Sequence, residues 1–361
     1  MKLPRPKKIN TYEYVAGLSS FKDKKAKIKL SANECALGPS PRAIEEYNKI
    51  SKNFKRYPDS DGISLRKKIG KKFKLDFNKI ILGSGSDQIL ELICKTFLNN
   101  GDEVIVPKFS FLIYRIYSKA NGAKIIYAKE DNYKISINNI LSNVTKKTKI
   151  VFLANPNNPT STYINKIDLI NLRKKLRSNI LLVIDDAYFE YVKSKKYSSG
   201  LQTFRNSKNV IVTRTFSKIY GLAGLRVGWG YASKNIIKYL NKIKPPFNIN
   251  MPGLFVASAA IEDNAWLKKE IKHVNKWRKI IFKEFKKMNI ETNEGNTNFL
   301  LANFDKKKIS AKKVFLLLAK SRILVRRMDV YGIKNSLRIT IGKSDENKKL
   351  INVLRKIFNV W

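Results

Sequence analysis

The chain has 361 residues, a hydrophobic content of 43% and a formal net charge of +45, from 73 Lys and Arg against 28 Asp and Glu. This length exceeds a single compact core, so we expect two domains, and the hydrophobic content excludes an intrinsically disordered chain. The two cysteines, Cys35 and Cys94, form neither a disulfide framework nor a metal-ligand spacing. The sequence has no apolar run of bilayer length and no apolar leader, so we expect a cytoplasmic protein without a membrane partner.

The excess of basic residues has two interpretations. One is binding to nucleic acid, whose affinity rests largely on phosphate contacts. The other is codon bias, because lysine, isoleucine and asparagine are abundant together. The lysines are scattered through every segment instead of forming a tail or an arginine-rich arm, which favours codon bias. We therefore expect no nucleic-acid partner, and we expect the positive field to favour small anionic substrates.

In chain order, residues 1–35 are predicted to be an irregular N-terminal arm, followed by a helix that begins near Arg42 after two prolines. From Lys79 onward, short apolar strands alternate with helices. These strands are predicted at 79–82, 103–107, 123–128, 148–154, 179–184 and 209–213. Continuous apolar strands separated by helices predict an α/β fold, with a mostly parallel central sheet covered on both faces.

After residue 250 the pattern changes. A long helical region extends to about Met288, and shorter strands and helices follow it to the C-terminus. We interpret residues 36–250 as a large domain and residues 251–361 as a smaller α+β domain.

Polar motifs follow five of the predicted strands. They are GSGSDQ at 83–88, KF at 108–109, NPNNP at 155–159, DDAY at 185–188 and RTFSK at 214–218. Ligands of open α/β sheets bind beyond the carboxyl ends of the strands. We therefore expect these five motifs to converge on one site.

Lys218 lies among hydroxyl residues, and Arg226 follows eight positions later. A buried amine loses its proton more readily and becomes a nucleophile toward carbonyls, while hydroxyls and a guanidinium satisfy phosphate oxygens. This combination suits a covalent adduct of an aldehyde that carries a phosphate. Taken alone, however, Lys218 is better explained as one of many surface lysines.

Asp185 ends an apolar strand, where a carboxylate is costly unless it is paired with a cation. It is either a partner for a protonated heteroaromatic nitrogen or a helix cap. Residues 83–86 lie between a strand and a helix, so their backbone N–H groups and the helix dipole can hold a dianion. A Schiff-base lysine, an aspartate beside a pyridinium and a phosphate site are together what pyridoxal phosphate requires.

Further motifs occur in a specific order along nearly the whole chain: NE..LGPSP, RYPD, GSGSDQ, NPNNPT, DDAY, TFSK...GLAGLRVGW, PFN, VRRM..YG and LRITIG. With this set the chain resembles the pyridoxal-phosphate aminotransferases of the aspartate aminotransferase fold. Among them it is most similar to the histidinol-phosphate aminotransferase family.

The resemblance implies roles around the cofactor. Lys218 would be the Schiff-base lysine that also moves the proton between the substrate Cα and the cofactor. Asp185 would hold the pyridinium nitrogen, and Tyr188 and Asn158 would bind the 3′-oxygen. Phe109 would stack on the ring, although packing alone also explains this aromatic residue. The cofactor phosphate would be held by Ser86, Asp87, Thr215, Ser217 and Arg226.

The resemblance also implies a substrate pocket and a partner. Arg338 would bind the anionic group of the substrate, unless it is an exposed cross-strand charge. Arg326, Tyr14 and Asn33 would complete that pocket. Tyr57 would reach the cofactor phosphate of a neighbouring subunit, which implies a homodimer with shared sites; packing alone also explains this residue.

Two positions depart from the pattern of the family. Ser161 replaces the glycine that usually ends NNPTG, and Arg327 stands where VRPM carries proline. We expect the first to alter the loop beside the ring and the second to alter the substrate pocket.

The expected activity is transamination between histidinol phosphate or imidazole acetol phosphate and glutamate or 2-oxoglutarate, a step of histidine biosynthesis. No metal is expected. The alternatives are an aromatic or other amino-acid aminotransferase, or a decarboxylase of a phosphorylated amino acid, with the same fold. A nucleic-acid-binding protein on an inactive aminotransferase scaffold is a further alternative.

Overall fold

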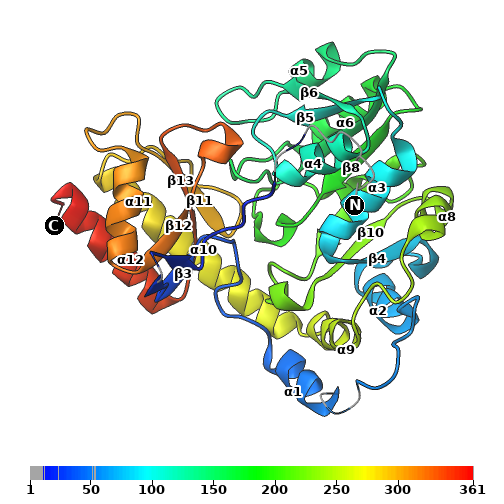
Figure 1. The fold of residues 1–361 in the computed structure, drawn as a ribbon, viewed down its shortest axis with the longest axis horizontal. Helices are drawn as coiled ribbons and strands as arrows, with labels where there is room; N and C mark the ends of the chain where they lie inside the picture. Colours follow the sequence, from blue (N-terminus) through cyan, green and yellow to red (C-terminus); the bar gives the residue numbers. More distant parts are fainter. Residues whose placement is uncertain (1–10, 12, 23, 51, 53, 361) are drawn as a thin grey trace, which may run out of the picture.

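The computed structural model describes residue 11 and residues 13–22, 24–50, 52 and 54–360. Its centre is a seven-stranded sheet (Figure 1). All of its strands except the edge strand at residues 124–128 are buried along most of their length. Their order across the sheet is β4 (Ile80–Ser84), β10 (Val227–Tyr231), β9 (Val210–Thr215), β8 (Leu181–Asp185), β7 (Thr148–Ala154), β5 (Glu103–Pro107) and β6 (Lys124–Ala128). All are parallel except β10, which is antiparallel to both of its neighbours. The predicted mostly parallel sheet is confirmed.

Helices cover both faces of this sheet. Buried apolar residues of α3 (Gly85–Phe97), α4 (Leu112–Ala120) and α8 (Lys234–Ile243) pack on one face. The other face packs on α2 (Ile63–Phe73), α5 (Ile137–Ser142), α6 (Lys166–Lys175) and α7 (Gly200–Phe204). Burial of both faces explains why the strands are continuously apolar instead of alternating.

The strand β10 was not predicted, because its sequence VGWGY contains two glycines that weaken a strand signal. The structure gives the reason for one of them. A Cβ atom at Gly228 would lie 2.2 Å from the backbone nitrogen of Ser86. Glycine at this position therefore lets the first turn of α3 approach the sheet, and this turn carries the predicted phosphate motif.

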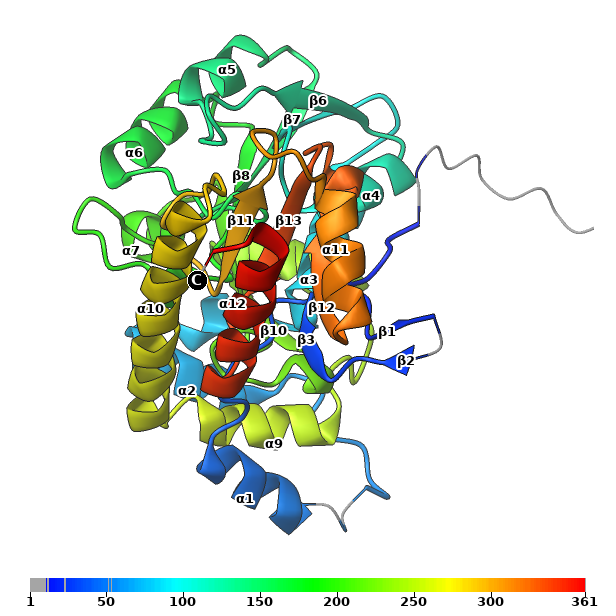
Figure 2. The ribbon, with the colours of Figure 1, turned by 90° about the vertical axis from the view of Figure 1, so that its left-hand side faces the viewer.

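A second, four-stranded sheet is built mainly from the C-terminal part of the chain. Its order is β11 (Phe299–Asn303), β13 (Ser336–Thr340), β12 (Ile323–Arg327) and β3 (Ile28–Leu30). The helices α10 (Asn264–Lys287), α11 (Ala311–Lys320) and α12 (Ser344–Phe358) lie together over it (Figure 2). The helices α1 (Pro41–Ile50) and α9 (Met251–Ala260) pack against each other at one end of the molecule. The predicted helical region up to Met288 is thus formed by α9 and α10.

The segment predicted to be an irregular arm contains three short strands. β1 (Ser20–Phe21) and β2 (Lys24–Lys25) form a two-stranded sheet, and β3 pairs in parallel with β12, with Ile28 opposite Ile323. The arm is therefore partly regular, because β3 completes the edge of the second sheet. The domain boundaries at residues 35 and 250 stay predictions. The described residues also contain 3₁₀ turns at Phe77–Lys79, Phe189–Tyr191, Ala223–Leu225 and Asp329–Tyr331. Within the described part of the chain, no helix is both long and apolar enough to cross a bilayer.

Candidate active site

A cavity of about 290 Å³ lies beyond the carboxyl ends of the large sheet and is also lined by residues of the second sheet. The side chains that line it come from four of the five predicted motifs, as well as from the arm and β13. Of the residues predicted for the site, those that line it are Tyr14, Asn33, Ser86, Asp87, Asn158, Asp185, Tyr188, Thr215, Ser217, Lys218, Arg226 and Arg338. The structure therefore brings most of the predicted set together.

Lys218 faces this cavity just after β9 ends. Its Nζ atom lies 3.4 Å from the carbonyl oxygen of Ala32 and 5.9 Å from the ring centroid of Tyr188. Burial, followed by the nearby charge of Arg338, lowers the pKa of Lys218 to about 8. An amine with this pKa is deprotonated often enough near neutral pH to attack a carbonyl carbon.

Asp185 ends β8 and is buried at the base of the cavity. The Tyr114 hydroxyl donates a hydrogen bond of 2.8 Å to its Oδ2 atom, and the backbone N–H of Ala187 donates one of 3.2 Å to Oδ1. Both donors are neutral. Burial raises the pKa of Asp185 to about 6, although the Tyr114 hydrogen bond acts in the opposite direction. A cationic group entering the cavity would stabilise this carboxylate.

One corner of the cavity is arranged to bind an anion. Arg226 donates to Ser217 Oγ at 3.4 Å and to Asp87 Oδ2 at 3.2 Å, beside the N-terminus of α3. A Cβ atom on Gly85 would lie 2.3 Å from Nη2 of Arg226, so glycine is required for this approach. The helix N-terminus, the guanidinium and the hydroxyls together form a site for a phosphate.

A second guanidinium occupies the opposite side, where β13 contributes Arg338. It donates to Asn158 Oδ1 at 2.6 Å and to the carbonyl oxygen of Ser31 at 3.0 Å. Its Nε atom is buried and has no protein partner among the described residues. This arginine thus retains hydrogen-bonding capacity for a second anion.

The phenol of Tyr188 lies between these groups. Its hydroxyl accepts a 3.0 Å hydrogen bond from Asn33 Nδ2, and burial raises its pKa to about 12. The phenol therefore stays protonated and remains able to donate a hydrogen bond. Tyr14 stands near the mouth with its ring edge-on to Phe111, 6.1 Å between centroids. Burial raises the pKa of Tyr14 to about 12 as well.

Three predicted residues lie outside the cavity lining. The ring of Phe109 packs toward Tyr133 and a small apolar cluster that includes Leu301 and Tyr331, so its predicted stacking on a cofactor must be corrected. The turn after β5 directs Phe109 away, and Phe111 lines the cavity instead.

The role predicted for Arg326 also needs correction. Its guanidinium donates to the carbonyl oxygens of Val15 and Ala16 and is buried behind them. It therefore positions the segment that carries Tyr14 instead of lining the pocket. Tyr57 is 81% exposed and stacks on Phe247, with 4.5 Å between ring centroids, so its ring lies outside this chain's own cavity.

Several residues that line the cavity were missed by sequence reasoning, and four of them have aromatic or charged side chains. Two are aromatic, Phe111 and Tyr114, and two are charged, Lys29 and Glu34. Tyr114 lies in the first turn of α4, directly after a motif-bearing strand end, and this position was the available signal. Nothing in the sequence distinguished Lys29 from the other lysines.

The two departures from the family pattern have different outcomes. Ser161 is buried with φ of +59°, a left-handed conformation that favours glycine. Its Oγ atom is 2.6 Å from Thr297 Oγ1 and accepts a 2.9 Å hydrogen bond from the N–H of Asn296, which links the Asn158 loop to the loop before β11. Arg327 forms an ion pair with Asp329 at 2.8 Å and lies outside the cavity lining.

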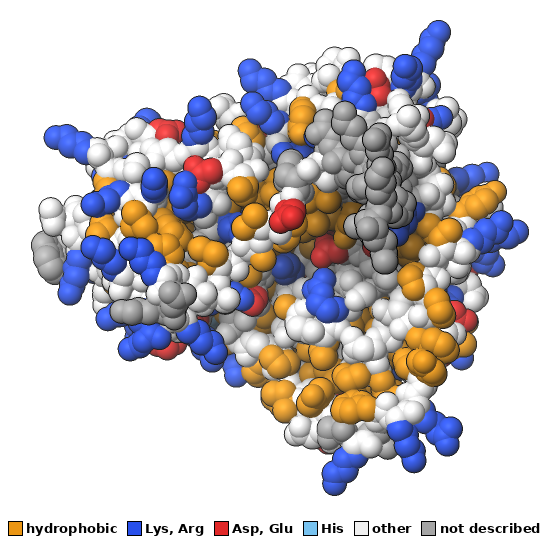
Figure 3. Space-filling view, viewed as in Figure 1, with side chains coloured by type: hydrophobic (Ala, Val, Ile, Leu, Met, Phe, Trp, Pro, Cys, Tyr) orange, Lys and Arg blue, Asp and Glu red, His pale blue; other side chains and the backbone are white. Residues whose placement is uncertain are grey.

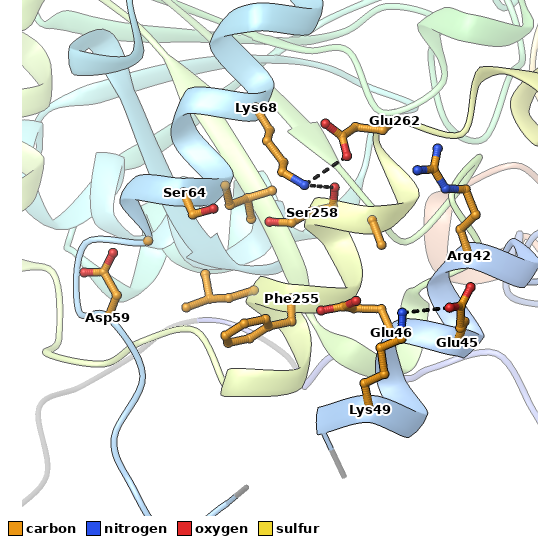
Figure 4. Close-up of a pocket in the computed structure, with 14 residues that line it drawn as sticks. Arg42, Glu45, Glu46, Lys49, Asp59, Ser64, Lys68, Phe255, Ser258 and Glu262 are labelled. Carbon is orange, nitrogen blue, oxygen red and sulfur yellow. Dashed lines mark hydrogen bonds and ion pairs between the residues drawn. The ribbon is translucent and has the colours of Figure 1, made fainter.

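A second hollow lies between α1, α2 and α9, far from these groups (Figure 4). Charged side chains surround it, including the ion pair between Lys68 and Glu262 at 2.9 Å. None of the predicted site residues lines it.

Comparison with known proteins agrees with the arrangement of the cavity. Residues 25–354 match the family model of class I and II aminotransferases. The chain belongs to this aminotransferase family. A histidinol-phosphate aminotransferase of Pelagibacter ubique is 50% identical over 360 residues, which cover 99% of this chain and 100% of that protein.

Solved aminotransferase structures have the same fold. The histidinol-phosphate aminotransferase of Sinorhizobium meliloti, solved in complex with pyridoxal-5'-phosphate, superposes with a TM-score of 0.87 at 22% identity over 93% of this chain and 92% of that one. A tetra mutant of the Thermus thermophilus aspartate aminotransferase gives a TM-score of 0.81 at 16% identity over 91% and 95% of the two chains. The predicted aspartate aminotransferase fold is confirmed.

Proposed function

We propose that this aminotransferase interconverts histidinol phosphate and imidazole acetol phosphate, with glutamate and 2-oxoglutarate as the second pair. The observation that carries this assignment is one cavity that holds a nucleophilic lysine, a buried carboxylate without its own cation and two separate arginine sites. The 50% sequence identity with the histidinol-phosphate aminotransferase of Pelagibacter ubique supports the choice of substrates.

The residues fit pyridoxal phosphate as the cofactor. Asp185 would hold the ring nitrogen, which supplies the positive charge that its two neutral donors do not. Arg226, Ser217, Thr215 and the start of α3 would hold the phosphate. Tyr188 and Asn158 would bind the ring oxygen, with Phe111 beside the ring in place of Phe109. When bound, the cofactor acts as an electron sink for the bond that is broken at the substrate Cα.

The protein's own groups then have defined tasks. Lys218 would hold the cofactor through its aldehyde carbon, and its amine, when free of that bond, would move the proton to and from the substrate Cα. Arg338 binds the phosphate ester of histidinol phosphate or the α-carboxylate of glutamate, because a guanidinium can donate two parallel hydrogen bonds to either anion. Asp185 would stay ionised beside the bound ring and would keep the ring nitrogen protonated.

The visible absorbance spectrum tests this function. The purified protein is loaded with pyridoxal phosphate, and histidinol phosphate or phenylalanine is added in single-turnover amounts. We expect histidinol phosphate to remove the absorbance band of the imine between Lys218 and the cofactor, and we expect Lys218→Ala to lack that imine band from the start. A preference for phenylalanine would indicate an aromatic aminotransferase, and release of carbon dioxide would indicate a decarboxylase. Absence of a cofactor band together with salt-dependent nucleic-acid binding would favour the inactive scaffold.

We also propose that the protein is a cytoplasmic homodimer with shared active sites. An apolar surface follows α1 and α9 at one end of the molecule (Figure 3). Its exposed large side chains are Ile44, Tyr47, Phe54, Tyr57, Phe247 and Phe255. Tyr57 belongs to this surface and not to its own chain's cavity, as expected for a residue that serves the site of a second copy. The two free cysteines accord with a reducing compartment.

Sedimentation velocity and a cofactor titration test the shared site. We expect a dimer at micromolar concentration, and we expect Tyr57→Phe to weaken cofactor binding by about threefold to tenfold through loss of one hydrogen bond. Tyr47→Phe is the matched control on the same surface. A monomer that binds the cofactor with unchanged affinity would exclude the shared site.

A further inference from the structure

We propose that Lys29 and Glu34 select the far end of both substrates. Glu34 accepts a hydrogen bond from the imidazole of histidinol phosphate, and Lys29 binds the side-chain carboxylate of glutamate. This inference rests on the proposed function and names the two side chains that would distinguish the two substrates. Neither residue has a part in holding the cofactor.

The placement of the segment 29–34 supports these roles. Ser31 contacts Arg338 through its carbonyl oxygen at 3.0 Å, and Ala32 contacts Lys218 Nζ through its carbonyl oxygen at 3.4 Å. Glu34 follows two residues later, close enough for its charge to act on the pKa of Lys218. The segment therefore runs from the second anion site past the reactive amine, and Glu34 comes after both.

The backbone of this segment is fixed while its charged ends remain accessible. Asn298 Nδ2 donates to the carbonyl oxygens of Asn33 and Glu34, each at 3.1 Å. The Lys29 ammonium lies 2.8 Å from Glu34 Oε1, and these two side chains are 34% and 42% exposed, both in the cavity lining. Ion pairs with this degree of exposure contribute little to stability, so either partner can exchange the other for a ligand.

The chemistry of the substrates explains why a pair is useful. In each substrate the reacting carbon carries one arm that ends in an anion, the phosphate ester or the α-carboxylate, and Arg338 binds this arm. The other arm ends in an imidazole in one substrate and in a carboxylate in the other. An imidazole N–H needs an acceptor and a carboxylate needs a donor, and the Lys29–Glu34 pair offers both at one place.

Separate half-reactions of the holoenzyme test the pair. For Glu34→Gln we expect kcat/KM for histidinol phosphate to fall about tenfold through loss of a charge-assisted hydrogen bond, and that for glutamate to stay within twofold. For Lys29→Met we expect the reverse pattern. Calorimetric titration of histidinol phosphate into the same variants loaded with pyridoxamine phosphate, which cannot react with an amine, measures binding without turnover and should show the same loss for Glu34→Gln alone.

The matched controls are Lys68→Met and Glu262→Gln, which break an ion pair with side-chain exposures of 35% and 43% outside the cavity (Figure 4). Both should leave both half-reactions unchanged. Equal losses for the two substrates in each cavity variant, or no loss in either, would overturn the selection by Lys29 and Glu34. A wild-type protein that does not react with histidinol phosphate would instead overturn the proposed function together with this inference.

Discussion

Two adjacent carboxylates, Asp185 and Asp186, have opposite surroundings. Asp185 faces the cavity and accepts hydrogen bonds, within the described part of the chain, from a phenol and a backbone amide. Asp186 forms a buried ion pair with Arg214 at 3.3 Å and also accepts from the backbone N–H groups of Gly200 and Leu201. Successive residues of a strand point to opposite faces, so the end of β8 delivers one carboxylate to each side of the sheet.

The difference shows how a functional charge is recognised in a protein interior. Burial raises the pKa of both aspartates. For Asp186 the cation is part of the fold, since Arg214 also lies 3.4 Å from the ring centroid of Phe189. For Asp185 the hydrogen-bond donors among the described residues are neutral, so a ligand must bring the cation. A buried carboxylate in this situation indicates a site for a cationic group.

Asp185→Asn should give the largest effect of these variants. It should lower kcat without lowering the stability of the protein. We expect kcat to fall on the order of a thousandfold, because an amide cannot stabilise a protonated ring nitrogen as a carboxylate does. The thermal midpoint of the cofactor-free protein should stay the same or rise, because a buried charge has been removed. Single-turnover kinetics and calorimetry measure both quantities. A variant with nearly full activity would contradict the assigned role.

Asp186→Asn should show the opposite pattern. Breaking one side of a buried ion pair leaves Arg214 uncompensated, and we expect a loss of about 3 kcal/mol in the free energy of unfolding. The protein that remains folded should keep kcat within a few fold. Denaturant unfolding and active-site titration separate the two effects. Unchanged stability would show that Arg214 finds other partners.

The pH dependence of stability distinguishes the same two residues. In the cofactor-free protein the pKa of Asp185 is raised to about 6, so the folded state holds this proton more tightly than the unfolded chain. The resulting stabilisation, on the order of 2 kcal/mol, is complete below pH 4 and is lost as the pH rises through 6. Asp185→Asn should remove this loss between pH 4 and pH 6.5, as measured by chemical denaturation. A wild-type profile as flat as that of the variant would contradict the raised pKa.

Tyr114→Phe should give the smallest effect. It removes the 2.8 Å hydrogen bond to Asp185 and leaves the packing of the ring on Phe152 in place. We expect about a threefold decrease in kcat, since one hydrogen bond contributes about 1 kcal/mol or less when a cationic ring is also bound. Tyr117→Phe, on the same helix, is the control and should leave kcat unchanged. A loss as large as that of Asp185→Asn would mean that Tyr114 itself takes part in the reaction.

The sequence allowed the large sheet and most of the cavity to be predicted, because continuous apolar strands end in polar motifs at one edge. It did not reveal β10, in which the close approach of Ser86 requires glycine at position 228. The positions of Phe109 and Arg326 were wrong because they depend on a three-residue turn and on the path of the arm. Both are set by tertiary contacts that local patterns do not encode. Lys29 gave no sequence signal among so many charges, and Glu34 belonged to the motif NE..LGPSP but received no predicted role.

The pairing of β3 with β12 has a consequence for biosynthesis of the chain. The strand at residues 28–30 leads directly into the segment that lines the cavity, yet its partner strand begins only at Ile323. On a ribosome this segment emerges early and has no sheet to join until nearly all of the chain has been synthesised. The large sheet can form before then, but the catalytic cavity is completed only by one of the last strands made. A truncated chain that lacks β12 would therefore contain Lys218 and Asp185, but β3 and the cavity-lining segment that follows it would lack the strand with which β3 pairs.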